Sequence, residues 1–300
     1  MFPSHVTIKE VGPRDGLQNE QTFVPTETKI QWIEQLSETG LSYIEVTSFV
    51  HPKWIPQLKD AEEVLKNIEK NKDVTYAALI PNRHGLERAI QVGLDEASVF
   101  MSATNAHNKK NINKSTDEAI VALKQVIAEA KQANIPVRGY LSTVFGCPYE
   151  GKVSVEKVKK ISYTLLEAGI YELSLGDTIG VANPKQVEYV LRELLKEIPK
   201  DKLALHFHNT RGFAIANIYA SLQLGMATFD SALGGLGGCP YAKGASGNVA
   251  TDDVVHFMHE LGVETGIKEE ALFQATRFIE PHIDHPLTSH SLKVNREQCV

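Results

Sequence analysis

The stretch SVEKVKKISYTLLEAGIYELSL, residues 154–175, contains one complete helix-to-strand step. Apolar residues recur every three or four positions in its first part, which is the spacing of a helix with one buried face. Ser154 stands where a helix N-cap prefers a hydroxyl, and Gly169 stands where helices commonly end. The run YELSL at 171–175 then predicts a short strand. The same step recurs along the whole chain.

Eight short apolar or β-branched runs, each followed by a helix-like segment, indicate the architecture. The predicted strands are 6–11, 43–48, 74–80, 96–101, 137–142, 171–175, 203–208 and 228–233. The clearest predicted helices are 26–40, 118–134, 154–169 and 183–198. Strict alternation of this kind is typical of βαβ units that build a parallel sheet.

Eight such units close naturally into a (β/α)8 TIM barrel. An open doubly wound sheet is the alternative, but no G-x-G-x-x-G follows the first strand. We therefore predict an α/β fold, a TIM barrel with extra C-terminal helices. The chain is expected to be a single catalytic domain, 1–300, with the barrel at about 5–262 and a helical extension at about 263–300. Towards the C-terminus, residues 249–280 predict two further helices and residues 281–300 a polar tail.

Composition narrows the classes of function. The 300 residues are 42% hydrophobic and 23% charged, with a net charge of −6. No basic surplus is present to neutralise phosphates, so we expect no nucleic-acid partner. No apolar segment is as long as a membrane span or the apolar part of a signal peptide. We therefore expect no membrane association and a cytoplasmic location. Three cysteines, Cys147, Cys239 and Cys299, form no close pair and predict no disulfide framework.

The run LALHFHN, 203–209, carries the strongest sign of chemistry. Side chains alternate along a strand, so His206 and His208 point to the same side, into the mouth of the barrel. Two imidazoles two residues apart can hold one metal ion. A pair of hydrogen-bonded core histidines is the alternative, but their place at the carboxyl end of a strand favours a metal site.

The first strand leads into VGPRDGLQNE, 11–20, which places Arg14 and Asp15 at the same mouth. A carboxylate there is a candidate third ligand, and a guanidinium can stabilise an oxyanion. In YIEVTS, 43–48, Glu45 is predicted to face the interior, where a carboxylate needs a cation nearby. Arg14 or the metal can meet that need, and Arg138 is an alternative partner.

Two further segments follow strands at the mouth. In SLGDTIG, 174–180, Asp177 can orient an imidazole or take a proton, or else cap the next helix together with Thr178. Between strand four and its helix, a polar loop predicted at 105–115 carries Lys109, Lys110 and Lys114. These lysines can hold ligand phosphates, although a solvated loop is the simpler interpretation.

The glycine-rich loop GGLGGCPYAKGASGN, 234–248, follows the last strand. A thiol near its centre, Cys239, favours a lid that delivers a reactive group on closure. A phosphate-binding turn and an inert buried thiol are the alternatives. The amide oxygen of Asn248 can bind a metal or cap the helix that starts near Val249, and its spacing alone favours the cap.

Five motifs in order give a family resemblance: VGPRDGLQNE, IEVTSF, SLGDTIGVANP, HFHNT and GGLGGCPYAKGASGN. From about residue 4 to about residue 295 the chain resembles the 3-hydroxy-3-methylglutaryl-CoA (HMG-CoA) lyases of the DRE-TIM metallolyase superfamily. Condensing relatives such as the isopropylmalate synthases share the first and fourth motifs but usually lack the last. The run DSALGG before the loop departs from the Ser-Val-Ala-Gly common in the family.

The resemblance implies a role for each candidate residue. Asp15, His206, His208 and Asn248 look like ligands of one divalent cation, Mg²⁺ or Mn²⁺, which reverses the capping preference for Asn248. Glu45 looks like a group near the metal, Arg14 like the enolate stabiliser, and Asp177 and His206 like proton-transfer groups. Cys239 looks like the thiol of a mobile loop. The implied substrate contacts are Arg14, Gln18, Ser48, Tyr140, Ser174, Thr178, Lys109 and Lys110.

The implied reaction cleaves HMG-CoA to acetyl-CoA and acetoacetate, chemistry that belongs to leucine degradation. An acyl-CoA is thus the expected substrate, and a homodimer is expected from the family and from the additional C-terminal helices. Proton delivery to the acetyl carbon is left open between His206 and Cys239. Condensation of acetyl-CoA with a 2-oxoacid, metal-dependent aldol cleavage of a free acid, and a non-catalytic acyl-CoA-binding or metal-binding barrel are the competing hypotheses.

Overall fold

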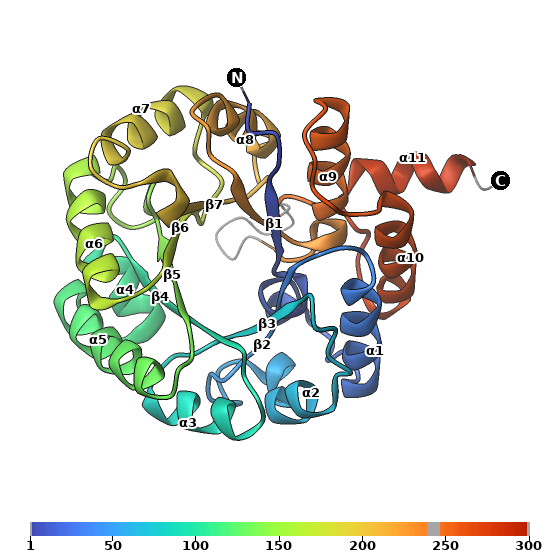
Figure 1. Ribbon diagram of the computed structural model, residues 1–300, viewed down its shortest axis with the longest axis horizontal. Coiled ribbons are helices and arrows are strands. Elements are labelled where there is room, and N and C mark those ends of the chain that lie inside the picture. Colours follow the sequence, from blue (N-terminus) through green and yellow to red (C-terminus); the bar gives the residue numbers. More distant parts are fainter. Residues whose placement is uncertain (1, 239–246, 299–300) are drawn as a thin grey trace.

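Eight parallel strands close into a barrel in the order of the sequence (Figure 1). The computed structural model describes residues 2–238 and 247–298. The strands are β1 (Thr7–Glu10), β2 (Tyr43–Ser48), β3 (Thr75–Leu79), β4 (Glu96–Ser102), β5 (Val137–Ser142), β6 (Glu172–Asp177), β7 (Leu203–Phe207) and β8 (Thr228–Ser231). The predicted α/β TIM barrel is confirmed, and β8 pairs with β1 to complete the ring.

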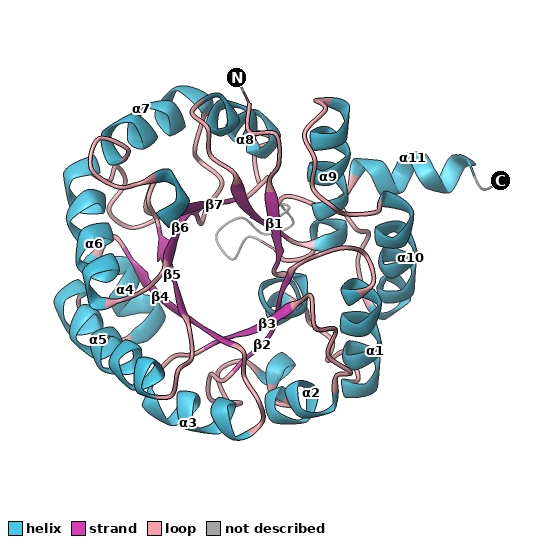
Figure 2. Cartoon of the chain, viewed as in Figure 1, coloured by secondary structure: helices cyan, strands magenta, loops and turns pink. Residues whose placement is uncertain are grey.

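Helices surround the strands as an outer layer (Figure 2). The α-helices are α1 (Thr26–Ser37), α2 (Ala61–Asn67), α3 (Arg83–Gln91), α4 (Asn105–Ile112), α5 (Thr116–Gln132), α6 (Val155–Ala168), α7 (Pro184–Leu194), α8 (Ala214–Gln223), α9 (Thr251–Glu260), α10 (Glu269–Ile279) and α11 (His290–Gln298). Short turns are the π-turn η1 (Gly12–Gly16) and the 3₁₀ turns η2 (Leu17–Asn19), η3 (Pro56–Leu58), η4 (Lys200–Lys202), η5 (Leu233–Gly235) and η6 (Glu280–His282).

Local signals set the helix ends. Ser154 caps α6 by accepting the N–H of Lys157, and Gly169 ends it in the left-handed conformation at φ 114°. Such a φ favours glycine because it has no Cβ to clash. Ser115 and Glu118 form a reciprocal capping box at the start of α5. The predicted elements thus begin and end within a few residues of the observed ones.

Two predictions about irregular segments are wrong. Residues 105–115 are not simply a loop, since 105–112 form α4. Residues 281–300 are not simply a tail, since 290–298 form α11. The two helices predicted within 249–280 are present as α9 and α10. The division of the chain into one domain with a barrel and an extension stays a prediction.

Glu10 connects neighbouring segments at the mouth of the barrel through hydrogen bonds. Its carboxylate accepts the N–H of Gly12 at 2.7 Å, the N–H of Leu233 at 2.9 Å and the hydroxyl of Thr251 at 2.5 Å. A Cβ at Gly12 would stand 2.5 Å from Glu10 Oε1, so any larger residue there would displace this carboxylate. Burial raises the pKa of Glu10 to about 7, against the lowering effect of these donors. One side chain thereby joins the first strand to η5 and α9.

We predict that Thr251→Val lowers the free energy of unfolding by about 1–3 kcal/mol, because the buried Glu10 carboxylate loses a donor. Equilibrium urea unfolding measures the change. Thr164→Val is the matched control, since that hydroxyl only back-bonds to the Lys160 carbonyl within α6. It should stay within about 0.5 kcal/mol of wild type. Equal effects of the two substitutions would contradict a special role of the Glu10 contact.

Candidate active site

Three potential metal ligands converge at the carboxyl ends of β1 and β7. Ligand atoms of Asp15, His206 and His208 all lie within 4.8 Å of one another. Asp15 lies in η1, where the N–H groups of Arg14, Asp15 and Gly16 all donate to the carbonyl of Val11. His206 lies in β7 and His208 directly after it, with both side chains buried. The active sites of TIM barrels lie at this end of the strands.

Asn248 completes the cluster from the last strand-to-helix connection. Its backbone forms an antiparallel bridge with His208, and its Nδ2 donates to Asp15 Oδ2 at 2.9 Å and to the Leu236 carbonyl at 3.1 Å. These two acceptors fix which amide atom is the nitrogen. The N-cap of α9 is Ala250, so the capping role considered for Asn248 is wrong.

The donor atoms of this cluster suit a divalent cation. Among the residues that the structure describes, His208 Nδ1 and Asn248 Oδ1 are buried without a hydrogen-bond partner. Unpaired buried polar atoms are costly unless something binds them. A carboxylate, two imidazoles and an amide oxygen are the ligand types that Mg²⁺, Mn²⁺ or Zn²⁺ bind. The residues present therefore fit a metal.

Protonation states favour the same interpretation. Burial raises the pKa of Asp15, but the nearby Arg14 and histidine charges outweigh it and hold the pKa at about 2. Burial lowers the pKa of His208 to about 3, because its charged form is poorly solvated. An ionised carboxylate and a neutral imidazole are the forms that bind metals.

Arg14 lies beside the cluster, held between two carboxylates. Its Nε donates to Glu45 and its Nη1 to Asp15 Oδ1 at 2.5 Å, and its guanidinium lies 5.5 Å from the ring centre of Tyr140. Burial opposes the charge, but the two carboxylates raise the pKa of Arg14 above its ordinary value. Glu45 therefore pairs with Arg14, and the alternative partner Arg138 lies elsewhere in the network.

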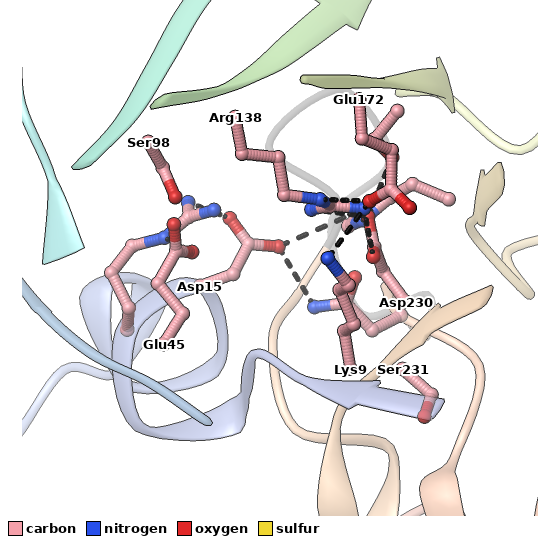
Figure 3. Close-up of polar contacts among 12 residues, drawn as sticks. Lys9, Asp15, Glu45, Ser98, Arg138, Glu172, Asp230 and Ser231 are labelled. Carbon is pink, nitrogen blue, oxygen red and sulfur yellow. Dashed lines mark hydrogen bonds and ion pairs between the residues drawn. The ribbon is translucent and has the colours of Figure 1, made fainter. Parts of the chain in front are cut away.

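A second layer of charge lies deeper in the barrel (Figure 3). Arg138 Nη2 donates to Asp230 Oδ1 at 2.8 Å and its Nε to Glu172 at 2.6 Å. Lys9 Nζ lies 2.8 Å from the same Glu172 oxygen. Sequence reasoning singled out none of Lys9, Glu172 and Asp230. All three are charged residues within predicted strands, at positions that alternation places on the inward side. This pattern was the available signal for them.

The inward network carries an excess of negative charge. Its cations are Lys9, Arg14 and Arg138, and its carboxylates are Asp15, Glu45, Glu96, Glu172 and Asp230. At full ionisation, three cations face five carboxylates, which leaves two negative charges. A divalent cation at the cluster would offset this charge. The raised pKa values of Glu96 and His206 make the excess smaller than the full count.

Asp177 ends β6 and lies at the edge of the site. Its two oxygens accept the N–H groups of Val181 and Ala182, and α7 is capped by Asn183 instead. The N-cap role considered for Asp177 or Thr178 is therefore wrong. Burial raises the pKa of Asp177 to about 6, which is near the range useful for proton transfer. Thr178 accepts the N–H of Thr143 at 2.9 Å.

Side chains predicted to contact substrate occupy several environments. Gln18 donates to Asp15 Oδ1 at 2.7 Å, and Ser48 accepts the N–H of Val50. Ser174 donates to Asp230 Oδ2 at 2.6 Å, so its hydroxyl lies in the deeper layer. The buried hydroxyl of Tyr140 has no hydrogen-bond partner among the described residues. Their roles toward substrate stay predictions.

The remaining predicted residues are either exposed or outside the described residues. Lys109 and Lys110 are exposed in the last turn of α4. Cys239, its loop at 239–246, and Cys299 lie outside the described residues. Cys147 is a free, buried thiol.

Comparison with known proteins identifies the family. The family model HMGL-like matches residues 5–279. This chain belongs to the HMGL-like family. The curated hydroxymethylglutaryl-CoA lyase YngG of Bacillus subtilis is 58% identical over 293 residues, which is 98% of each chain. The predicted family resemblance is therefore confirmed.

Solved structures of HMGL-like proteins share the whole architecture. The crystal structure of the Bacillus subtilis HMG-CoA lyase matches with a TM-score of 0.97 and covers 98% of this chain and 99% of its own. An HMG-CoA lyase from Acinetobacter baumannii, solved in complex with coenzyme A and 3-methylmalate, is 41% identical with a TM-score of 0.94. The two chains match over 100% and 98% of their lengths. Within residues 2–238 and 247–298, this HMGL-like protein has no helix long and apolar enough to span a membrane.

We predict that Mn²⁺ raises the melting temperature of the metal-free protein. The gain should reach about 4 °C at a free concentration about 100 times Kd. His208→Gln should abolish most of this gain because it removes a ligand of the cluster. His259→Gln is the control, since His259 pairs with Glu269 on the surface. Differential scanning calorimetry measures each shift. A full gain in the His208 variant would argue against this cluster as the binding site.

Proposed function

We propose that this protein is a lyase that cleaves HMG-CoA to acetyl-CoA and acetoacetate, with one divalent cation bound by Asp15, His206, His208 and Asn248. The observation that carries the proposal is the meeting of these four side chains at the barrel mouth. Membership of the HMGL-like family supports the reaction, and the names of close relatives support the substrate.

Mg²⁺ or Mn²⁺ is the proposed ion. Two oxygen and two nitrogen donors would leave two positions of an octahedron for substrate oxygens, an arrangement less usual for Zn²⁺. When bound, the ion would polarise the C3 hydroxyl of the substrate and lower its pKa as a Lewis acid. The remaining chemistry belongs to side chains around it.

Arg14 is the proposed stabiliser of the enolate that forms when the C2–C3 bond breaks. Glu45 and Asp15 fix its guanidinium from two sides, so little reorganisation is needed during the reaction. A preorganised cation in a site that excludes water is commonly worth a few kcal/mol in the transition state. We therefore assign Glu45 to holding Arg14 in place.

Asp177 is the proposed acceptor of the hydroxyl proton. His206 lies with Nε2 3.9 Å from Asp15 and Nδ1 3.5 Å from Asp230, so both ring nitrogens face protein groups. An imidazole has no third nitrogen with which to exchange a proton. Asp177, with its pKa raised to about 6, is better suited to this step. Protonation of the acetyl carbon is left open between His206 and Cys239, and Cys239 lies outside the described residues.

An acyl-CoA is the proposed form of the substrate. Lys109 and Lys110, exposed on α4 after β4, are proposed to approach the phosphates of its nucleotide end. The family and the additional helices α10 and α11 support a homodimer, whose mass sedimentation velocity can measure. A cytoplasmic location is proposed because no apolar segment of the sequence has the length of a membrane span.

We predict that Arg14→Met lowers kcat for HMG-CoA cleavage by about 100- to 1,000-fold, because the enolate loses its preformed cation. A coupled assay in saturating Mn²⁺ measures acetyl-CoA and acetoacetate, which wild type should release in equal amounts. Arg192→Met is the control, since Arg192 forms only an exposed pair with Glu188 on α7. It should keep the wild-type rate. Near-normal turnover by Arg14→Met would refute the enolate role.

The pH dependence should follow the state of Asp177. As a base it must be ionised, so activity is full above its pKa and is lost as pH falls through about 6. We predict an acidic limb in kcat with an apparent pKa near 6 when measured at saturating Mn²⁺. Asp177→Asn should lower kcat at every pH and remove this limb. A wild-type kcat that stays constant down to pH 5 would exclude Asp177 as the base.

A further inference from the structure

Asp230 lies beside the metal cluster without belonging to it. It is paired in register with His206 across β7 and β8, so the two side chains start from neighbouring positions and point into the barrel together. Its Oδ2 stands 3.5 Å from His206 Nδ1. On the other side of the same ring, Nε2 stands 3.9 Å from Asp15 Oδ2. The imidazole therefore lies between a candidate metal ligand and a deeper carboxylate.

The position of Asp230 is fixed by groups other than the histidine. Arg138 Nη2 donates to Oδ1 at 2.8 Å, and Ser174 Oγ donates to Oδ2 at 2.6 Å. Asp230 and Arg138 are both fully enclosed, so this pair is not loosened by solvent. An ionised carboxylate with both oxygens held by donors is a rigid acceptor.

His206 Nδ1 has no hydrogen-bond partner among the described residues, although it is buried. A buried N–H that lacks an acceptor is destabilising, so the ring gains by turning this nitrogen toward Asp230. His208 differs, because among the described residues no carboxylate other than the candidate ligand Asp15 is found near its ring. Among the described residues, only His206 therefore has a second carboxylate at the ring nitrogen that faces away from Asp15.

We propose that Asp230 is a positioning residue for the metal centre. It accepts a hydrogen bond from His206 Nδ1–H, which fixes the imidazole in the tautomer whose Nε2 lone pair faces the cation. Ligating histidines commonly donate their second N–H to a carboxylate, and loss of that partner weakens metal binding by about 10- to 100-fold. This inference rests on the metal centre proposed above, and it assigns Arg138 and Ser174 to orienting Asp230.

The test compares Mn²⁺ affinity in two variants of the same buried network by isothermal titration calorimetry. Asp230→Asn should weaken Mn²⁺ binding by about 10- to 100-fold. Glu172→Gln is the matched control, because it also removes one carboxylate from Arg138 but leaves His206 untouched. It should bind Mn²⁺ as wild type does, even if both variants lose similar stability. Equal affinities for Asp230→Asn and wild type would overturn the proposal.

A second measurement needs no change at Asp230. Long-range ¹H–¹⁵N spectra of wild type labelled with ¹⁵N-histidine, saturated with Mg²⁺ and assigned with His206→Gln, report the tautomer of His206. We expect Nδ1–H, and an Nε2–H signal would overturn the proposal whether or not Asp230→Asn folds.

His208→Gln separates the two ideas. If it abolishes Mn²⁺ binding while Asp230→Asn binds as wild type, the metal centre stands and the positioning role fails. If wild type itself binds no Mn²⁺, both fail.

Discussion

The pairing of buried charges inside the barrel is the constraint on which the site depends. Arg14, enclosed and permanently charged, must find carboxylates, since an unpaired ion in a dry interior costs several kcal/mol. Its Nε donates to Glu45 and its Nη1 donates to Asp15. Because the guanidinium is planar, the directions of these two hydrogen bonds are fixed relative to each other. Asp15 is thereby held with its other oxygen toward Asn248. The geometry of the metal cluster follows from where one guanidinium can satisfy its hydrogen bonds.

Alternation along strands explains what the sequence could predict. It places His206, His208 and Glu45 on the inward side, and the structure agrees that they are enclosed there. It does not say which inward groups meet across the barrel, because that depends on the register between strands. Arg138 illustrates the limit. Alternation placed it inward, but it pairs with Glu172, its register neighbour on β6, and with Asp230 across the interior.

Segments stabilised by tertiary polar contacts were the least predictable. The helix α4 has few apolar residues, so no helical periodicity marks it. It is anchored instead by Asn108, which accepts the N–H of Ser102 and donates to the carbonyl of the same residue. The start of α11 is held similarly, since Asp253 of α9 accepts the N–H groups of His290 and Ser291. A side chain distant in sequence supplies the cap, and local patterns cannot show it.

The charges of the polar interior are paired in a chain, which accounts for its tolerance of so much charge. Lys9 contacts Glu172, Glu172 contacts Arg138, and Arg138 contacts Asp230. Positive and negative groups thus alternate from Lys9 toward His206. At the mouth, Asp15 and Glu45 share Arg14. The divalent cation proposed beside Asp15 would extend the alternation by one step and would offset part of the buried negative charge.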